Sequence, residues 1–345
     1  MPQKRLIRRL TSAMTMTCLL LAHGGVAMAA DLTVAAWGGL WEQSLRKCVV
    51  EPFEKKTGKK VDIVLGTVTQ WLNQIQANPS HPPIDIIYNT SDGSFDAIGH
   101  GLVDRFTLKN VPNMAKLTPD FANIGGGYGT AHNYGGMGIL YDSKTVKDPP
   151  KSWKEFVDGT IAGKWKAMMP NLNQGTTVNM WQFAKLYGGG IDNVQPGLDR
   201  IKAMLESGNL SFWSEPNQVL NALKSGDVDL AMYWDGRSWA FIADGNSDYK
   251  YITPAPGVVV AVTWIQKVKG SPDIGWDYVN MSLSTEAQTC FGTAMRYGVA
   301  NAQVKFTPQI QALITPADKL ILPPFKELPA KQSQWVEMWN KQIGR

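Results

Sequence analysis

Strand-like and helix-like segments alternate along most of this chain, and the alternation limits the fold more than any other feature of the sequence. The short apolar run Leu32–Ala36 is followed by a helical run over residues 40–56, and the stretch "IDIIYN" by another helical segment. Such alternation predicts parallel sheets covered by helices on both faces. At 345 residues the chain exceeds what one hydrophobic core usually serves. We therefore expect an α/β protein with two lobes, each built on a mainly parallel sheet.

Two segments interrupt the alternation. Residues 125–138 are polar and rich in glycine, and residues 253–258 combine proline with glycine. We expect the chain to cross between the lobes at these two places, which form a hinge. The predicted lobes comprise residues 30–131 with 261–306, and residues 132–260 with 307–345.

The N-terminus has the pattern of a secretory signal peptide. Basic residues precede an uncharged run from Thr11 to Ala22, and Ala27-Met28-Ala29 supplies the small-x-small cleavage pattern. A membrane anchor is the alternative, but the run is too short to span a bilayer comfortably. We predict that residues 1–29 are removed after Ala29 and that the protein is periplasmic. Residues 1–29 carry four of the five net positive charges, and a nearly neutral mature chain argues against a nucleic-acid partner.

Export leaves two cysteines, Cys48 and Cys290, in an oxidising compartment. They lack the Cys-x-x-Cys spacing that is typical of metal sites. The alternatives are one disulfide or two buried thiols, and we favour the disulfide.

Motifs for catalysis, cofactors and metals are missing from the sequence. It contains no Gly-x-Ser-x-Gly, no His-Glu-x-x-His and no phosphate-binding loop, and its mature histidines are widely separated. We therefore predict no enzyme, no cofactor and no metal. A secreted hydrolase remains the alternative from another class, because catalytic triads assemble from distant segments.

Two stretches place tryptophan at the end of a strand. In "LTVAAWGGLWEQ" the strand ends at Trp37 before two glycines, and in "AMYWDGRSWAF" it ends at Trp234 before an Asp-Gly turn. Ligands of open parallel sheets bind beyond the carboxyl ends of the strands. Two facing lobes would set these two indoles across one cleft. Trp41, on the first turn of the following helix, fits either the cleft or the core.

The order of several motifs resembles a known family. The stretches "TVAAWGG", "FEKKTGKKVDIV", "IDIIYNTSDG", "GDVDLAMYWDGR" and "RYGVANAQ" are similar to those of the spermidine/putrescine-type periplasmic binding proteins, within the family 1 extracellular solute-binding proteins. The resemblance spans the mature chain. It implies a monomeric, hinge-closing receptor without catalysis, which hands a small solute to an ABC permease driven by an ATPase. Ferric-ion receptors share the fold but need adjacent tyrosines, and this chain has no Tyr-Tyr pair.

The resemblance also implies ligand-binding residues. Matching the family position by position gives Trp37, Trp41, Thr90, Ser91, Trp234 and Tyr297. Four further residues complete the predicted site, namely Asn173, Asp235, Arg237 and Arg296.

Two departures from the family concern the charge of the solute. Polyamine binders carry Trp-x-Asp where this chain has Val260-Ala261-Val262, and the amides of Asn171, Asn173 or Gln174 stand in place of a second acid. An ammonium group that leaves water needs an anion or several acceptors. Arginine suits carboxylates, although a surface or interlobe salt bridge is the alternative for both Arg237 and Arg296. We predict a solute that is less cationic than spermidine and bears a carboxylate, with a polyamine as the alternative.

Overall fold

The structure is a computed structural model, and it describes residues 30–172, 176–325 and 327–344. The predicted signal peptide and the predicted ligand residue Asn173 lie outside the described residues. No helix within the described ranges is long and apolar enough to cross a membrane.

The chain folds as a mixed α/β protein, as predicted. The strands are β1 (Leu32–Ala36), β2 (Val61–Leu65), β3 (Ile86–Asn89), β4 (Thr130–Asp142), β5 (Ala167–Pro170), β6 (Leu210–Trp213), β7 (Leu230–Trp234), β8 (Tyr249–Ile252), β9 (Val258–Lys267), β10 (Gly298–Val299) and β11 (Leu320–Ile321). The helices are α1 (Leu40–Leu45), α2 (Glu51–Thr57), α3 (Val68–Ala77), α4 (Ser91–Gly99), α5 (Pro119–Ala122), α6 (Trp153–Ile161), α7 (Thr176–Leu186), α8 (Gln195–Glu206), α9 (Pro216–Ser225), α10 (Asp235–Ala243), α11 (Ile274–Ser282), α12 (Thr285–Met295), α13 (Pro308–Gln311) and α14 (Leu328–Gln342).

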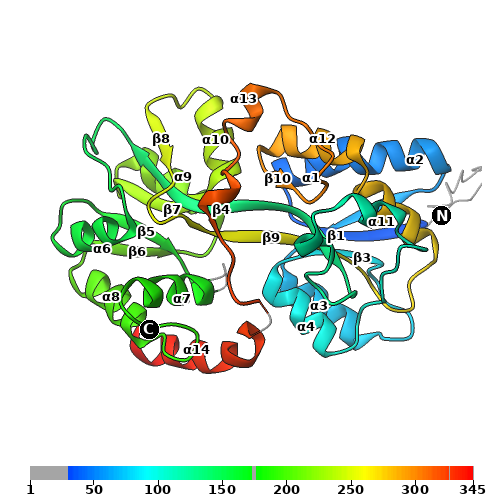
Figure 1. Ribbon diagram of the computed structural model, residues 1–345, viewed down its shortest axis with the longest axis horizontal. Helices are drawn as coiled ribbons and strands as arrows, with labels where there is room; N and C mark the ends of the chain where they lie inside the picture. The colour runs from blue at the N-terminus through cyan, green and yellow to red at the C-terminus, as the bar shows by residue number, and fades with distance from the viewer. Residues whose placement is uncertain (1–29, 173–175, 326, 345) are drawn as a thin grey trace, which may run out of the picture.

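Two long antiparallel strands join two parallel half-sheets. The strand order is β2-β1-β3-β9-β4-β7-β5-β6, and β4 and β9 extend through both halves of the molecule (Figure 1). β1 runs parallel to β2 and β3, and β5 runs parallel to β6 and β7. The pairs β3–β9, β9–β4 and β4–β7 are all antiparallel. β3 and β7 therefore run in opposite directions, and their carboxyl ends face each other across the middle of β4 and β9.

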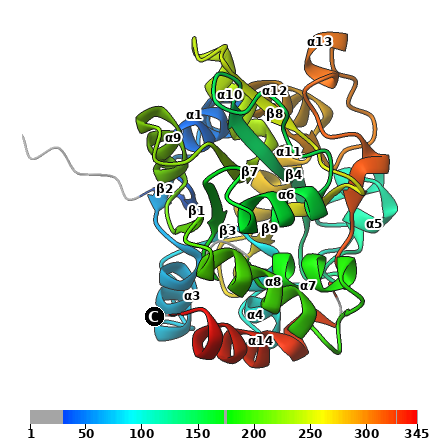
Figure 2. The same cartoon turned by 90° about the vertical axis from the view of Figure 1, so that its left-hand side faces the viewer.

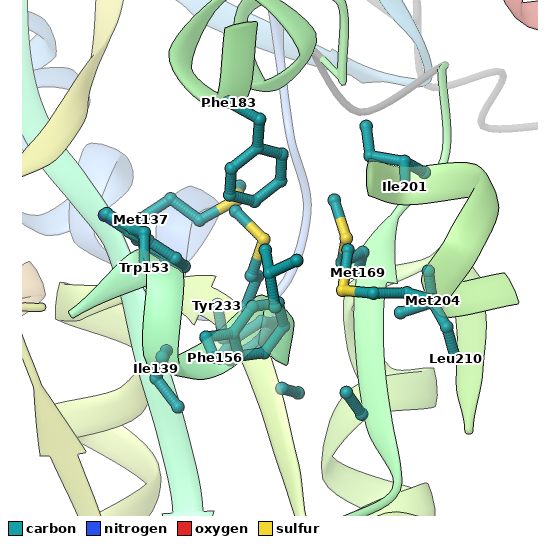
Figure 3. Close-up of a cluster of buried hydrophobic side chains, with 14 of the residues drawn as sticks. Met137, Ile139, Trp153, Phe156, Met169, Phe183, Ile201, Met204, Leu210 and Tyr233 are labelled. Carbon is teal, nitrogen blue, oxygen red and sulfur yellow. The ribbon is translucent and has the colours of Figure 1, made fainter. Parts of the chain in front are cut away.

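Separate hydrophobic cores support the two halves. One core is drawn from β4, β5, β7 and the helices around them, and it includes Trp153, Phe156 and Met169 (Figure 3). Trp335 and Trp339 on α14 belong to the same core. The main core of the other half combines strands β1 to β3 with α11, α12 and the C-terminal part of β9. Figure 2 shows α14 lying against the half that contains α7 and α8.

The helical run predicted over residues 40–56 is divided into three pieces. A π-helical segment, Arg46–Val50, lies between α1 and α2. Pro52, in the first turn of α2, has no amide proton to continue the α-helical bonding. The wider π turn absorbs this missing donor. Gly58 then ends α2 in the left-handed conformation with φ of 71°.

The glycine-rich segment 125–138 is not the loop that its composition suggests, because residues 130–138, which include its entire second half, belong to β4. Its glycines allow close packing here. A Cβ on Gly136 would lie 2.4 Å from Val258 Cγ2, and one on Gly138 would lie 2.4 Å from the Ile252 carbonyl oxygen. Glycine in this strand therefore serves close approach of neighbouring elements.

A third segment also runs between the halves. Residues 307–325, which we call the C-terminal strap, lead from the half that contains α12 to α14 in the other half (Figure 1). Within the strap, β11 pairs in parallel with β9 through Leu320–Val258 and Ile321–Val259. The strap therefore lies beside the two crossing strands.

Candidate functional site

The predicted ligand residues gather where β1, β3 and β7 end. On β9, Trp264 pairs with Asn89, the last residue of β3. Trp234, the last residue of β7, pairs with Met137 of β4, and the neighbouring Gly136 of β4 pairs with Val260 of β9. About five residues of β9 separate the ends of β3 and β7, which corresponds to roughly 16 Å. We use the term junction for these facing strand ends and the strand beneath them: Trp37 after β1, residues 90–92 after β3, residues 234–237 at the end of β7, and residues 260–264 of β9.

The middle of β9 forms the base of the junction. Val260 and Val262 are buried, whereas Ala261 is exposed and Thr263 is half-buried. By the resemblance to polyamine binders, the carboxylate position corresponds to Val262, which is apolar and buried, and the solvent-facing Ala261 beside it carries only a methyl group.

Two tryptophans follow β1, and the structure separates their roles. Trp37 is half-buried, and its ring meets the edge of Trp41 at 5.3 Å and of Trp71 at 5.9 Å. Trp41 itself is only 4% exposed and packs against Tyr88 and Phe291. Trp41 therefore packs in the core on the first turn of α1, and its part in ligand binding stays a prediction.

Hydroxyl groups line the start of α4. The Thr90 hydroxyl caps this helix by accepting a hydrogen bond from the Gly93 amide at 3.3 Å, and Thr90 is exposed. The Ser91 hydroxyl accepts a bond from Trp264 Nε1 at 3.1 Å. Ser91 thus connects α4 to β9 at the base of the junction.

Asp92 is a junction residue that the sequence analysis missed. It is half-buried in the first turn of α4, and burial raises the pKa of its carboxyl group. Among the described residues it has no hydrogen-bond or ion-pair partner. On the next turn of α4, Phe95 meets the Trp264 ring at 5.2 Å, which places α4 beside the middle of β9.

Trp234 and Arg237 face the junction from the opposite half. Trp234 is half-buried at the end of β7 and packs edge-on against Trp213 at 4.9 Å. The Arg237 guanidinium lies 5.7 Å from the centre of the Trp234 ring and makes no ion pair with any described residue.

Two phenols stand beside the Arg237 guanidinium. Burial raises the pKa of Tyr233 and of Tyr297, and the positive charge of Arg237 opposes that rise in both. Tyr297 comes from the other half of the molecule, directly before β10. Its ring also closes over the start of α10, because a Cβ on Gly236 would lie 2.5 Å from Tyr297 Cε1.

Asp235, a predicted ligand residue, is buried at 1% exposure and bonded within the protein. One carboxylate oxygen accepts bonds from the Gly136 amide at 2.9 Å and the Thr315 hydroxyl at 2.6 Å, and the other accepts from the Gly236 amide at 2.7 Å. Burial nevertheless raises the pKa of Asp235 to about 6. Asp235 therefore connects β4, α10 and the C-terminal strap and leaves no oxygen for a solute.

Among the described contacts, none brings Arg296 to the junction residues. Arg296 ends α12 in the left-handed conformation with φ of 57°, and its Nη1 donates to the Ala294 carbonyl at 3.4 Å. No described contact joins it to Arg237 or to the tryptophans. Asn171 lies at the end of β5, where its amide donates to the Ser214 hydroxyl at 3.4 Å.

Other features lie apart from the junction. Cys48 and Cys290 form a disulfide that joins the π-helical segment to α12. A surface hollow of about 360 Å³, lined by Val103, Arg105 and Tyr128 among others, lies at the far end of β9. Within the described ranges, no group of three or more His, Cys, Asp or Glu side chains is placed to hold a metal ion.

Comparison with known proteins identifies the family. A model for the family described as "Bacterial extracellular solute-binding protein" matches residues 49–317. The chain belongs to this family. As a solute-binding protein it is a small-solute receptor of the kind that serves ABC importers, and the family is not enzymatic, which argues against the hydrolase alternative.

Relatives of this solute-binding protein recognise different solutes. The thiamine-binding periplasmic protein of Escherichia coli K12 is 21% identical over 285 residues, which cover 79% of this chain and 81% of that protein. A norspermidine sensor of Vibrio cholerae is 26% identical over 119 residues, which cover 34% of this chain and 33% of the sensor. These sequence relatives leave the solute of this receptor open.

Solved structures share the two-lobed fold. An extracellular solute-binding protein from Bordetella parapertussis superimposes with a TM-score of 0.77 at 27% identity, covering 90% of this chain and 98% of that one. The protein MotA from Agrobacterium tumefaciens, in complex with glucopine, gives a TM-score of 0.76 at 19% identity, covering 90% and 99%. The predicted fold class is thereby confirmed.

Proposed function

We propose that this receptor binds a small organic solute that bears a carboxylate and delivers it, in the periplasm, to an ABC permease coupled to an ATPase. The solute lies at the junction, between Trp37 on one lobe and Trp234 on the other. The observation that carries this proposal is the half-buried guanidinium of Arg237, which has no counter-ion among the described residues.

The energetics of Arg237 favour an anionic ligand. A guanidinium that is partly removed from water loses hydration, and the face of Trp234 returns only about 0.5–2 kcal/mol. A carboxylate can accept two parallel hydrogen bonds from the planar guanidinium. The hydroxyl of Tyr297, beside the guanidinium, is a further donor to the same oxygens.

The same geometry disfavours a polyamine. Ala261 provides no negative charge at the base of the junction, and Asp235 is buried and fully engaged with the protein. Asp92 is then the only carboxylate among the junction residues that lacks a protein partner. A solute with three or four ammonium groups would leave most of them unpaired and would face the positive charge of Arg237.

Replacement of Arg237 by glutamine tests the anionic solute. In a thermal-shift panel of carboxylates and polyamines, a carboxylate present at 100 times its Kd should stabilise the native protein by about 2.7 kcal/mol. Arg237→Gln should weaken that ligand by about 10- to 100-fold, because a charge-assisted hydrogen bond is lost. The matched control is Arg105→Gln, since Arg105 also stacks on an aromatic ring at 5.7 Å but lies outside the junction. Micromolar binding of spermidine that is insensitive to Arg237→Gln would restore the polyamine alternative.

Lobe closure is a second expected property. The junction is built from two lobes, with proposed boundaries at 131/132, 260/261 and 306/307, and only a closed form presents both walls to the solute. Small-angle scattering should therefore show a smaller radius of gyration when a carboxylate found in the panel is saturating. An unchanged scattering profile, with binding verified by calorimetry, would rule out the hinge.

A further inference from the structure

The junction holds two charged side chains of opposite sign, one from each half, that have no ion-pair partner among the described residues. Asp92 follows β3 on α4, and Arg237 follows β7 on α10. The ends of β3 and β7 are about 16 Å apart along β9 and, with β9 and β4 between them, roughly 14 Å apart across the sheet. Asp92 and Arg237 each stand three residues beyond those ends and do not pair with each other. A ligand with one charge at each end of a carbon chain would therefore satisfy both when the lobes close.

We propose that the solute is a zwitterion whose carboxylate binds Arg237 and whose ammonium group binds Asp92. The proposal rests on the carboxylate recognition proposed above and adds the second charge. The uncharged middle of the solute then lies against Trp37, Trp234 and the methyl group of Ala261. Aromatic and apolar surfaces suit the carbon chain of a small amino acid or of a related amino-carboxylate.

Asp92 differs from an ordinary acid at a helix start. Acids are common in the first turn because they interact favourably with the helix dipole, and most of them are solvated. Asp92 is half-buried on the helix whose Ser91 and Phe95 contact Trp264, and no cation among the described residues pairs with it. The buried lysine of the same lobe, Lys267, is held elsewhere by Asp104 at 2.8 Å. A partly desolvated carboxylate without a partner is stabilised when a ligand brings a positive charge.

The placement of the two charges on different lobes also explains how a zwitterion would select the closed form. Each lobe alone satisfies one end of the solute, and only closure satisfies both ends. A simple carboxylate lacks the ammonium group, and a polyamine lacks the carboxylate. Both would therefore bind more weakly than a zwitterion of matching length.

Matched pairs of compounds test the second charge. The probes are 5-aminovalerate against valerate and 6-aminohexanoate against hexanoate, in which a carbon chain separates the two charges, with affinities measured by calorimetry on the mature protein. At least one zwitterion should bind about tenfold or more tightly than its partner without the amine. Asp92→Asn should remove this preference, so that the two members of a pair bind alike, whereas Arg237→Gln should weaken both members.

Control variants and contrary outcomes separate the two proposals. Asp96→Asn is the matched control, because Asp96 lies on the same helix but is exposed and contacts His100 at 3.1 Å. If Asp92→Asn does not fold, Asp92→Ser provides the same test with a smaller side chain. Equal affinity with and without the amine, unaltered in Asp92→Asn, would overturn the zwitterion and leave the carboxylate receptor standing. No binding of either member of any pair would overturn both.

Discussion

Replacing both Cys48 and Cys290 by serine should lower the free energy of unfolding by several kcal/mol. The disulfide joins residues that are 242 positions apart, and loop-entropy models give roughly 5 kcal/mol for a closure of that length. It also fastens the π-helical segment to α12, the helix that leads into Tyr297. Denaturant unfolding of the parent and of the double variant measures the difference in unfolding free energy, provided that this free energy depends equally steeply on denaturant concentration in both proteins.

The control for this prediction is a thiol count. Denatured but unreduced protein, made in an oxidising compartment, should contain no free thiol after removal of residues 1–29. Two titratable thiols would contradict the bond, and a double variant as stable as the parent would contradict its energetic contribution.

Acid should destabilise the protein through His132. This imidazole is 0% exposed, lies 5.0 Å from the Tyr88 ring and 4.9 Å from the Phe291 ring, and burial lowers its pKa from 6.5 to about 4. The folded protein keeps His132 neutral, whereas the unfolded chain takes up a proton below about pH 6.5. Stability should therefore fall as the pH drops from about 6.5 to 4, by about 3 kcal/mol in total.

Comparing the His132→Gln variant with the parent isolates the contribution of His132 to the pH dependence of stability. His132→Gln should flatten the slope of unfolding free energy between pH 6.5 and 4, whereas His81→Gln at an exposed position should retain it. The raised pKa of Asp235 acts with the opposite sign, because stability from that group is lost as the pH rises from about 4 to 6. Only the difference between parent and variant therefore reports on His132. Identical slopes in the parent and in His132→Gln would contradict the prediction.

Local sequence patterns were sufficient for the elements that place the site. Alternating strands and helices, and tryptophans at strand ends, put Trp37 and Trp234 in opposite halves, and the strand-like run Leu32–Ala36 is β1 with the same bounds. What a local pattern lacks is the direction in which a side chain points after a strand ends. Trp41 and Asp235 both follow a strand end by a few residues, but each turns into the protein.

Asp92 illustrates the reverse case. An aspartate after Thr-Ser at the start of a helix has the ordinary appearance of a residue near a cap, and its sequence position carries no sign of burial. The helix that carries it is held against Trp264, through Ser91 and Phe95, and Trp264 is 172 residues from Asp92 in the chain and lies level with the end of β3 through the pairing of β3 with β9. Register between distant strands is therefore the information that sequence reasoning lacked here.

The attachment of the C-terminal strap has a mechanical consequence for the proposed closing motion. Two adjacent strands, such as β4 and β9, form a ribbon that can both bend and twist. The Asp235 carboxylate fixes Thr315 of the strap to Gly136 of β4, and β11 fixes the strap to β9 a few residues further on. A third connection held at two points resists torsion of the ribbon more than it resists bending. We therefore expect the strap to guide the proposed closing movement, so that each closure returns the two walls to the same alignment.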